Sequence, residues 1–542
     1  MALLKDISLF WHTAKPLKAV QFYGRLWHRF YRPRFDIDPA VTPRNWGTWH
    51  PPTVRDISMR GAGDFIFLNH NDCLPQKGGW QTIGNSALWR YNLHYFDDLT
   101  ARNYEERIKW HRALINRWIG ENIPGDGIGW DSYPTSLRIV NWIKYAFAGN
   151  SMDSDWIRSL AIQSRWLRKR LEWHLLGNHL LTNAKALCFA GCFFQGKEAQ
   201  EWLKQGLDLL GDQLSEQILD DGGHFELSPM YHNIILEDVL DLINLSLAYP
   251  EQIPVEYQNQ LQKCSRMMFR WMGFMGHPDG ESAFFNDATK EIAAPPQELK
   301  EYAVHLGLES SDSIEKHQVY LEPSGYFRWV RGPAVLIGDV GQIGPDYIPG
   351  HGHADTLSFE LSIGAQRILV NPGTSLYEDS PERLRQRGTG AHNTVEVDGE
   401  NSSEVWKSFR VARRAKPFDF RIKKRGEEWR ELECSHDGYK RLKGRNIHCR
   451  SWQLEEGRLV VRDKIQGPFM SAVARFHLHP AIKVTGNSLL LPNGMNIKFA
   501  GEGGEFQIVE SMWHPEFGKS IPSHCIELHL NTPKASVSFE WN

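Results

Sequence analysis

The chain has 542 residues, of which 41% are hydrophobic and 23% are charged, and its 62 Lys and Arg against 65 Asp and Glu give a net charge of −3. This length predicts two or more domains, and the composition excludes a disordered or fibrous chain. Because the charges nearly cancel, no global basic field indicates a nucleic-acid partner, and we expect none. No apolar run approaches the roughly 20 residues of a membrane helix.

Residues 1–84 form the first predicted unit, a basic aromatic arm with its lead-in. Between residues 15 and 35, lysines and arginines interleave with aromatic residues such as Phe22, Trp27 and Phe30. A basic amphipathic segment of this kind is typical of peripheral contact with a membrane surface or a polyanion. An arm that packs its aromatic side chains onto the main body explains the same pattern, and the sequence leaves both interpretations open.

The first residues also bear on the compartment. Lys5, Asp6 and His12 interrupt every apolar core that a Sec-type signal peptide needs, so we expect a cytoplasmic protein. A periplasmic or envelope-associated location is the alternative. Seven scattered cysteines without a CxxC pair indicate reduced thiols.

Residues 85–320 form the second predicted unit, and its hydrophobic period is helical. In the segment 155–174, Trp156, Leu160, Leu167 and Leu171 recur at helical spacing while basic residues take the other side. Further helices are predicted at 103–120, 134–148, 179–194, 197–219, 230–249 and 255–275. Serial helical hairpins of this kind close into an α/α ring or stack as a solenoid, and no sequence repeat chooses between the two.

Residues 321–542 form the third predicted unit, in which the period changes to that of strands. Strands are predicted at 334–340, 356–363, 367–370, 394–397, 458–462, 472–477, 488–491, 496–499 and 525–530. The segment 491–494, Leu-Pro-Asn-Gly, is a hairpin turn. Helices followed by strands predict a multidomain α+β protein in which an antiparallel β-sandwich follows the helical domain, with the active site at their junction.

Polar residues gather in four clusters that could carry chemistry. They lie at Tyr133–Trp142, Gly177–Asn183, His224–His232 and Pro349–Asp355. The first three fall at predicted helix starts. If the helices form a ring, these helix starts lie at the same open end of the ring. His351 would then face that end from a sandwich loop.

Several hydrolytic and nucleotide-binding motifs are absent from the sequence, including GxSxG, the P-loop, HExxH and a strand-linked GxGxxG. A glycosidase needs two carboxyl groups, and Glu226 with Asp287 or Asp131 could be nominated, but no spacing pairs them. The clusters are instead rich in Asn, His, Tyr and Arg. These residue types suit β-elimination of a uronic-acid polysaccharide, which needs donors for the carboxylate, a base for the C5 proton and an acid for the departing C4 oxygen.

Three motifs carry a family resemblance. His351-Gly-His-Ala-Asp-Thr-Leu-Ser-Phe, Leu369-Val-Asn-Pro-Gly-Thr and Ala391-His-Asn-Thr-Val, with Phe225–His232 and Asn178-His179 upstream, resemble the heparinase II/III-like polysaccharide lyases. The resemblance spans nearly the whole chain from about residue 85. It implies an incomplete α/α toroid followed by an antiparallel β-sandwich, with an acidic polysaccharide bound between them.

The resemblance also implies catalytic roles for four residues. Asn178 would neutralise the uronate carboxylate, with His179 nearby. Tyr231 would be the acid, and the base too where stereochemistry allows, while His351 would be the base for the other C5 epimer or a second carboxylate contact. To these we add Arg138, Asn141 and Glu226 as substrate-contacting residues.

A metal site is a further implication of the resemblance, although no cofactor is required for the reaction. Several relatives hold a structural metal through two His and an Asp, which map here to His353, position 371 and His392. Position 371 is Asn371, and a neutral amide oxygen is a poorer zinc ligand than a carboxylate. The sequence therefore leaves a structural zinc open.

Two other functions remain open beside the lyase. One is a glycoside hydrolase of the same fold that uses Glu226, and the other is a non-catalytic glycan-binding or assembly protein. The basic arm resembles family members that act in capsule, exopolysaccharide or lipopolysaccharide metabolism, so a polymer made by the producing cell is one expected substrate.

Overall fold

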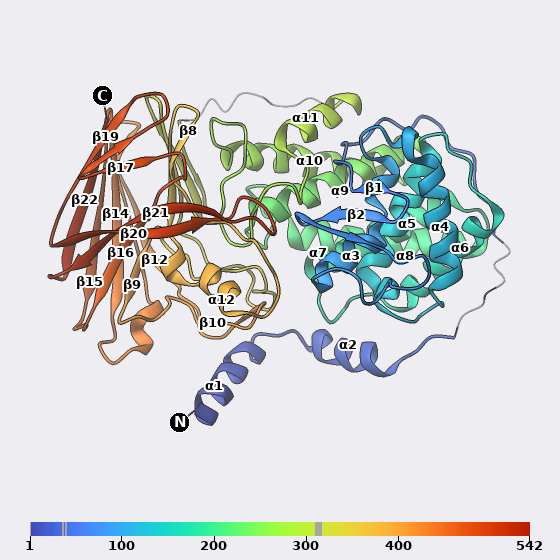
Figure 1. Ribbon diagram of the computed structural model, residues 1–542, viewed down its shortest axis with the longest axis horizontal. Coiled ribbons are helices and arrows are strands. Elements are labelled where there is room, and N and C mark those ends of the chain that lie inside the picture. The colour runs from blue at the N-terminus through green and yellow to red at the C-terminus, as the bar shows by residue number, and fades with distance from the viewer. Residues whose placement is uncertain (1, 35–36, 38–40, 309–316, 542) are drawn as a thin grey trace.

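The computed structural model describes residues 2–34, 37, 41–308 and 317–541, which form a helical half and a sheet half side by side (Figure 1). The helical half is the incomplete α/α toroid and the sheet half is the antiparallel sandwich, so the predicted fold class is confirmed. The domain boundaries at residues 84 and 320 stay predictions. No helix within the described residues is long and apolar enough to cross a membrane.

The toroid is built from helices whose ends lie within five residues of the predicted ones, except that α3 and α11 were not predicted. Almost all of α7 is buried because α5, α8 and α9 surround it, and His179 is its one residue that is not buried. The helices are α3 (Ala87–Tyr95), α4 (Ile108–Glu121), α5 (Ser132–Phe147), α6 (Ser154–Lys169), α7 (Gly177–Phe193), α8 (Lys197–Gln217), α9 (Pro229–Ala248), α10 (Val255–Phe274) and α11 (Pro296–His305).

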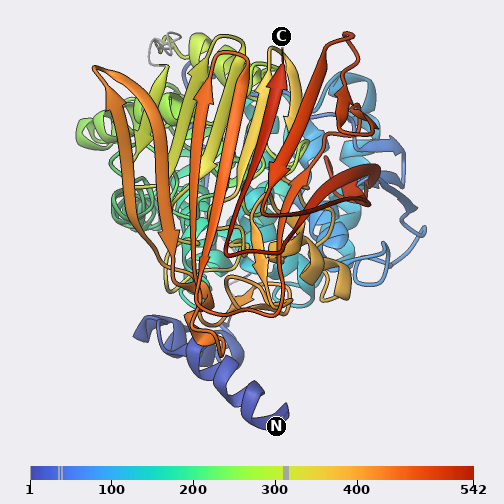
Figure 2. The same cartoon turned by 90° about the vertical axis from the view of Figure 1, so that its left-hand side faces the viewer.

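The sandwich contains three antiparallel sheets, seen face-on in Figure 2. The first has the order β12-β13-β14-β15-β22-β19-β18-β17, the second β20-β21-β16-β9 and the third β4-β5-β6-β7-β8. The first sheet is made of β12 (Pro417–Arg425), β13 (Glu428–His436), β14 (Ile447–Glu455), β15 (Arg458–Gln466), β17 (Lys483–Thr485), β18 (Ser488–Leu490), β19 (Asn496–Glu502) and β22 (Lys534–Trp541). The other two are made of β4 (Gln318–Leu321), β5 (Tyr326–Arg331), β6 (Ala334–Asp339), β7 (Phe359–Ile363) and β8 (Gln366–Leu369), and of β9 (Val395–Val397), β16 (Ala472–His477), β20 (Gly504–Trp513) and β21 (Ile521–Leu530).

One apolar core joins the three sheets. Phe327 of β5 packs edge-on against Trp452 of β14, with ring centroids 5.2 Å apart, and Phe476 of β16 packs against Phe539 of β22 at 5.5 Å. The eight-stranded sheet therefore covers both smaller sheets, as in other face-to-face sandwiches. The predicted hairpin turn at 491–494 joins β18 to β19, so that prediction is confirmed.

The residues before the toroid form more than an arm. Helices α1 (Ala2–Ala14) and α2 (Ala19–Phe30) lie along one side of the molecule, below both halves in Figures 1 and 2. A small sheet of β1 (Met59–Gly61), β2 (Asp64–Phe67) and β3 (His70–Cys73) then packs Met59 and Phe65 into the toroid core. This sheet was not predicted from the sequence.

Between β8 and the first sheet lie a short helix, α12 (Pro381–Arg387), and the strand pair β10 (Val405–Trp406) and β11 (Arg410–Val411). The loop of residues 340–358 between β6 and β7 carries the His351 cluster. Both segments face the helical half, where α7 and α9 begin, and they supply residues to the site described next.

Candidate active site

Two helix starts and one sandwich loop build the candidate site. Helix α9 begins at Pro229, where the Ser228 side chain accepts a hydrogen bond from the backbone N–H of Tyr231, and proline at the first helical position adds to this start signal. Helix α7 begins at Gly177, whose φ of +56° is left-handed. A Cβ at Gly177 would lie 2.4 Å from a carboxylate oxygen of Glu226, so glycine is required there by both backbone and space.

Asn178 lies against Glu226. The Asn178 side-chain nitrogen Nδ2 donates toward both carboxylate oxygens of Glu226 at 3.1 Å, and the Asn178 backbone N–H donates to one of them at 3.0 Å. Burial would raise the pKa of Glu226, but the neighbouring His351 and His224 and the Asn178 donors outweigh it and lower that pKa. Glu226 is therefore an ionised, almost fully buried acceptor, and its position favours orienting Asn178 over direct contact with a substrate.

His351 joins the two halves of the molecule. Its Nε2 lies 3.5 Å from a Glu226 oxygen, and its Nδ1 lies 3.0 Å from Oδ2 of Asp287. Tyr231 stacks on the imidazole, with ring centroids 3.8 Å apart and a 30° tilt. Asn178, Tyr231 and His351 thus surround one small region, and 12% of the His351 side chain is exposed to solvent there.

The Tyr231 hydroxyl lies 3.2 Å from the hydroxyl of Tyr377, a residue that the sequence analysis did not single out. Burial, followed by the neighbouring Tyr377, raises the pKa of Tyr231 well above its ordinary value. The phenol of Tyr231 therefore keeps its proton at neutral pH, as a general acid must. Tyr377 lies in the loop before α12, where no periodic pattern points to it.

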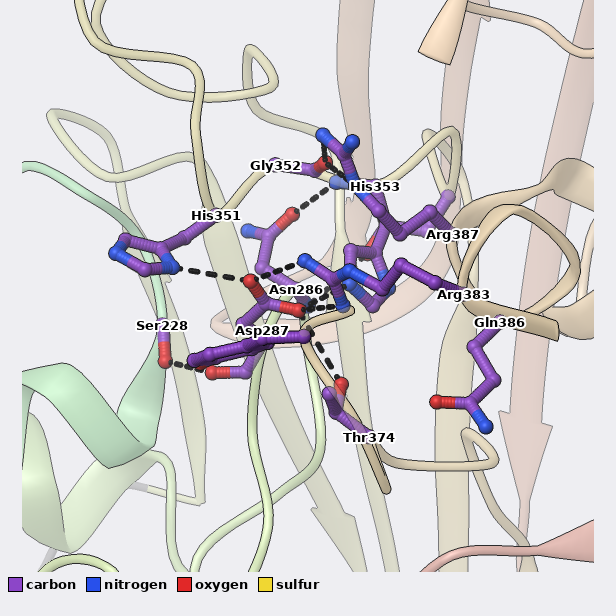
Figure 3. A network of polar contacts seen from close by, with 12 residues as sticks. Ser228, Asn286, Asp287, His351, Gly352, His353, Thr374, Arg383, Gln386 and Arg387 are labelled. Atoms are coloured by element: carbon purple, nitrogen blue, oxygen red, sulfur yellow. Dashed lines mark hydrogen bonds and ion pairs between the residues drawn. The ribbon is translucent and has the colours of Figure 1, made fainter. Parts of the chain in front are cut away.

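Asp287 is the centre of a buried polar network (Figure 3). Arg383 of α12 donates to both of its oxygens at 2.5 and 2.7 Å, His353 contacts it at 2.8 Å and Thr374 donates at 3.3 Å. Burial would raise the pKa of Asp287, but Arg383 and the bonds from the two histidines hold it well below its usual range. This carboxylate fixes the ring of His351 through Nδ1 and leaves Nε2 for chemistry. Arg383 was missed because its segment resembles an ordinary charged surface helix.

His353, Asn371 and His392 come together, but their arrangement does not fit a metal. His353 Nδ1 lies 3.3 Å from His392 Nε2, His353 Nε2 bonds to Asp287, and His392 Nδ1 lies 3.0 Å from the amide oxygen of Asn371. All four imidazole nitrogens of the pair are thus engaged within the protein. Among the described residues, no group of three or more His, Cys, Asp or Glu side chains is placed to hold a metal ion.

His179 lies beside this region. Its Nδ1 is 3.2 Å from Glu172, and its ring packs on Tyr133 at 4.6 Å. Burial would lower the pKa of His179, but the Glu172 carboxylate outweighs this and raises it. The His179 side chain is 30% exposed, compared with 12% for His351.

The two other predicted substrate contacts, Arg138 and Asn141, both lie on α5. Arg138 has no exposed surface, its guanidinium stacks 3.9 Å above Trp118 and it donates to Gln163, so the prediction that it contacts substrate is wrong. Its donors stabilise helix packing in the toroid core. Asn141 donates from its amide nitrogen to the Tyr95 carbonyl and to Asp97, and its contact with substrate stays a prediction.

Comparison with known proteins agrees with this architecture. The family model for the heparinase II/III N-terminus matches residues 143–306, and the model for the heparinase II/III-like C-terminal region matches residues 315–542. A heparin-sulfate lyase of Bacteroides stercoris is 28% identical over 42% of this chain and 37% of its own length. A heparin-sulfate lyase of Bacteroides thetaiotaomicron is 24% identical over 60% of this chain and 55% of its own.

Solved structures show the same fold. The crystal structure of heparinase III superposes with a TM-score of 0.69 at 18% identity, covering 86% of this chain and 80% of the other. The matched part of this chain spans about a third to a half of the curated relatives' length. The two family models together cover most of the chain in the expected order, and the chain belongs to the heparinase II/III-like family.

Proposed function

We propose that this protein is a polysaccharide lyase that cleaves a uronic-acid-containing acidic polysaccharide by β-elimination. The observation that carries the proposal is the meeting of Asn178, Tyr231 and His351, from α7, α9 and a sandwich loop, around one partly open region. An amide, a phenol and an imidazole are the donor, the acid and the base that this reaction needs. The similarity to heparin-sulfate lyases supports the same class of reaction.

Asn178 is suited to hold the uronate carboxylate. An amide nitrogen carries two hydrogens, and the contact with Glu226 uses one of them. The second can donate to the substrate carboxylate, which lowers the cost of the negative charge that develops when the C5 proton leaves. Glu226 fixes the direction of this donor because it also accepts from the Asn178 backbone.

His351 and Tyr231 are suited to move the two protons. His351 takes the C5 proton on Nε2, and Asp287 stabilises the resulting imidazolium through Nδ1. The electron pair of the C5–H bond forms the C4–C5 double bond as the C4–O bond breaks. Tyr231 then donates its phenolic proton to the departing oxygen, and the products are a new hydroxyl end and an unsaturated uronate.

A hydrolase that uses Glu226 is disfavoured by the state of the carboxylates. A glycosidase needs one carboxyl group that carries a proton, with its pKa raised. Glu226 and Asp287 both have lowered pKa values, and Asp287 is locked by Arg383. Neither is poised to act as the acid.

We further propose that the site works without a metal ion. The positive charge beside Asp287 comes from Arg383, and the His353 and His392 rings are committed to hydrogen bonds. The neutral Asn371 amide supports this proposal, since zinc sites draw on histidine, cysteine and carboxylate ligands.

The substrate is tested by a screen of acidic polysaccharides that includes heparan sulfate, chondroitin sulfate, alginate and the producing cell's own capsule. Cleavage is followed by the ultraviolet absorbance of the unsaturated uronate. We expect absorbance with at least one polymer, loss of it in Tyr231→Phe and retention in Tyr257→Phe, a matched substitution on α10. Saturated products would indicate hydrolysis, and binding without chain shortening would indicate the non-catalytic glycan-binding alternative.

A further inference from the structure

Helix α2 turns a continuous apolar stripe toward solvent. Phe22, Tyr23, Leu26, Trp27 and Phe30 recur at the spacing of one helix face, and their exposed fractions lie between 46% and 72%. The alternative that the arm packs these aromatic side chains onto the main body is therefore wrong. A contiguous exposed apolar face of five large side chains is typical of an interaction surface.

Helix α1 repeats the pattern on the same side of the molecule (Figures 1 and 2). Ile7, Phe10 and Trp11 follow the i, i+3, i+4 spacing, and each is more than half exposed. Ile7 and Trp11 point outward, whereas Phe10 also packs edge-on against Trp406 of β10, with ring centroids 4.9 Å apart.

Basic residues flank the two stripes. Residues 1–34 contain seven Lys and Arg and a single acidic residue, although the whole chain carries a net charge of −3. Arg25 and Arg29 are exposed beside the α2 stripe. A pocket of about 120 Å³ lies between Arg34 and α6, and its lining is mixed in charge, because Arg168 and Lys169 share it with Glu198.

The arm is fixed to both halves of the protein. On the sandwich side, the Trp406 indole donates to the Thr13 hydroxyl at 3.0 Å. On the toroid side, Arg170 donates to the carbonyl oxygens of His28 and Tyr31 at 2.7 Å. In α2, a Cβ at Gly24 would lie 2.8 Å from the backbone of His174, so this helix lies directly against the toroid. A partner that binds the stripes is thereby held in a fixed orientation to the candidate active site.

We propose that α1 and α2 form an interfacial anchor that docks this protein onto an anionic lipid surface. Apolar aromatic faces enter the boundary between headgroups and acyl chains, and flanking arginines pair with the anionic headgroups. A polyanion in solution would use the basic residues and leave the apolar stripes exposed. A bilayer contacts both the basic residues and the apolar stripes, and it would place the candidate active site at a set height above the membrane.

Vesicle co-sedimentation of the full chain tests the apolar half of the proposal. Vesicles of phosphatidylcholine with about a third phosphatidylglycerol are compared with pure phosphatidylcholine. We expect preferential binding to the anionic vesicles, and roughly tenfold or greater weakening in the double variant Trp27→Ser, Phe30→Ser, since each buried aromatic ring contributes on that scale. Met470→Ser is the matched control, because Met470 is 90% exposed on the sandwich, and it should bind as the unaltered chain does.

Charge reversal tests the electrostatic half. Removing one basic residue near an anionic surface weakens partitioning about fivefold, so Arg25→Glu with Arg29→Glu should weaken it more than about twentyfold. The control reverses Lys483 and Lys498, which are exposed on β17 and β19, and should have little effect. Equal binding to both vesicle types, unchanged binding in both arm variants, or a lipid-independent dimer that the Trp27→Ser, Phe30→Ser variant dissolves would overturn the proposal.

Discussion

Substitution of Asp287 by asparagine keeps the shape of the side chain and removes its charge. The Asp287 carboxylate has no exposed surface, and it accepts two bonds from Arg383, which is also fully buried. An asparagine would keep one oxygen and turn an N–H group toward a guanidinium that only donates. The buried charge of Arg383 would then lack its partner.

We expect Asp287→Asn to lower the free energy of unfolding by about 3–5 kcal/mol, the cost of leaving one charge of a buried pair unpaired. Denaturant unfolding at neutral pH, followed by tryptophan fluorescence, measures this change. Glu201→Gln is the matched control, because its pair with Arg168 is at the surface, with side chains 44% and 35% exposed. It should cost no more than about 1 kcal/mol.

A double-mutant cycle with Arg383→Met separates the charge effect from loss of packing. If the buried charge causes the loss, the double variant should be more stable than Asp287→Asn with Arg383 intact, because the unpaired guanidinium is gone. A cost for Asp287→Asn as small as that of the surface control, or strict additivity in the cycle, would refute the assignment of Asp287 as the charged centre of the site.

Three further predictions concern the start of α7, the toroid core and the metal. Gly177→Ala should lower lyase activity at least tenfold by displacing Glu226. Gly149→Ala is the control and should be active, because Gly149 has the same left-handed backbone but open space around it. Equal activity of the two variants would contradict the crowding argument. Lys185→Met should destabilise the fold by about 3–5 kcal/mol, measured by thermal or denaturant unfolding, because it leaves two buried aspartates of α9 short of a partner; a loss below about 1 kcal/mol contradicts this. Prolonged chelation should leave the activity unchanged and elemental analysis should find no stoichiometric zinc, and inactivation that zinc reverses would show that a metal is needed.

Most helices of the toroid were predicted because their apolar residues recur at the helical period, although α3 and α11 were not. The sandwich was predicted only in part. Strands β12 and β13 at the edge of the eight-stranded sheet were among those missed, since charged residues such as Lys423 and Glu431 alternate with or replace apolar ones along them. Such strands are stabilised by pairing with neighbours distant in sequence, which a local pattern does not reveal.

Site residues that belong to sequence motifs were predicted, and those outside motifs were not. Asn178, Tyr231 and His351 stand in recognisable segments, and the structure places them together. Asp287 and Arg383 are 96 residues apart, and only the fold makes them a pair. Arg138 was misjudged for the opposite reason, because a polar residue near a helix start also serves to satisfy buried carbonyl groups, as Arg138 does for His94.

The central claim is that one sugar acid is held by Asn178, Tyr231 and His351 together. A crystal structure of Tyr231→Phe with an acidic oligosaccharide from a polymer that the unaltered protein cleaves tests it most directly. The account predicts a uronate carboxylate within hydrogen-bonding distance of Asn178 Nδ2 and a C5–H bond directed at His351 Nε2. A sugar bound elsewhere, or one whose carboxylate points away from Asn178, would contradict it.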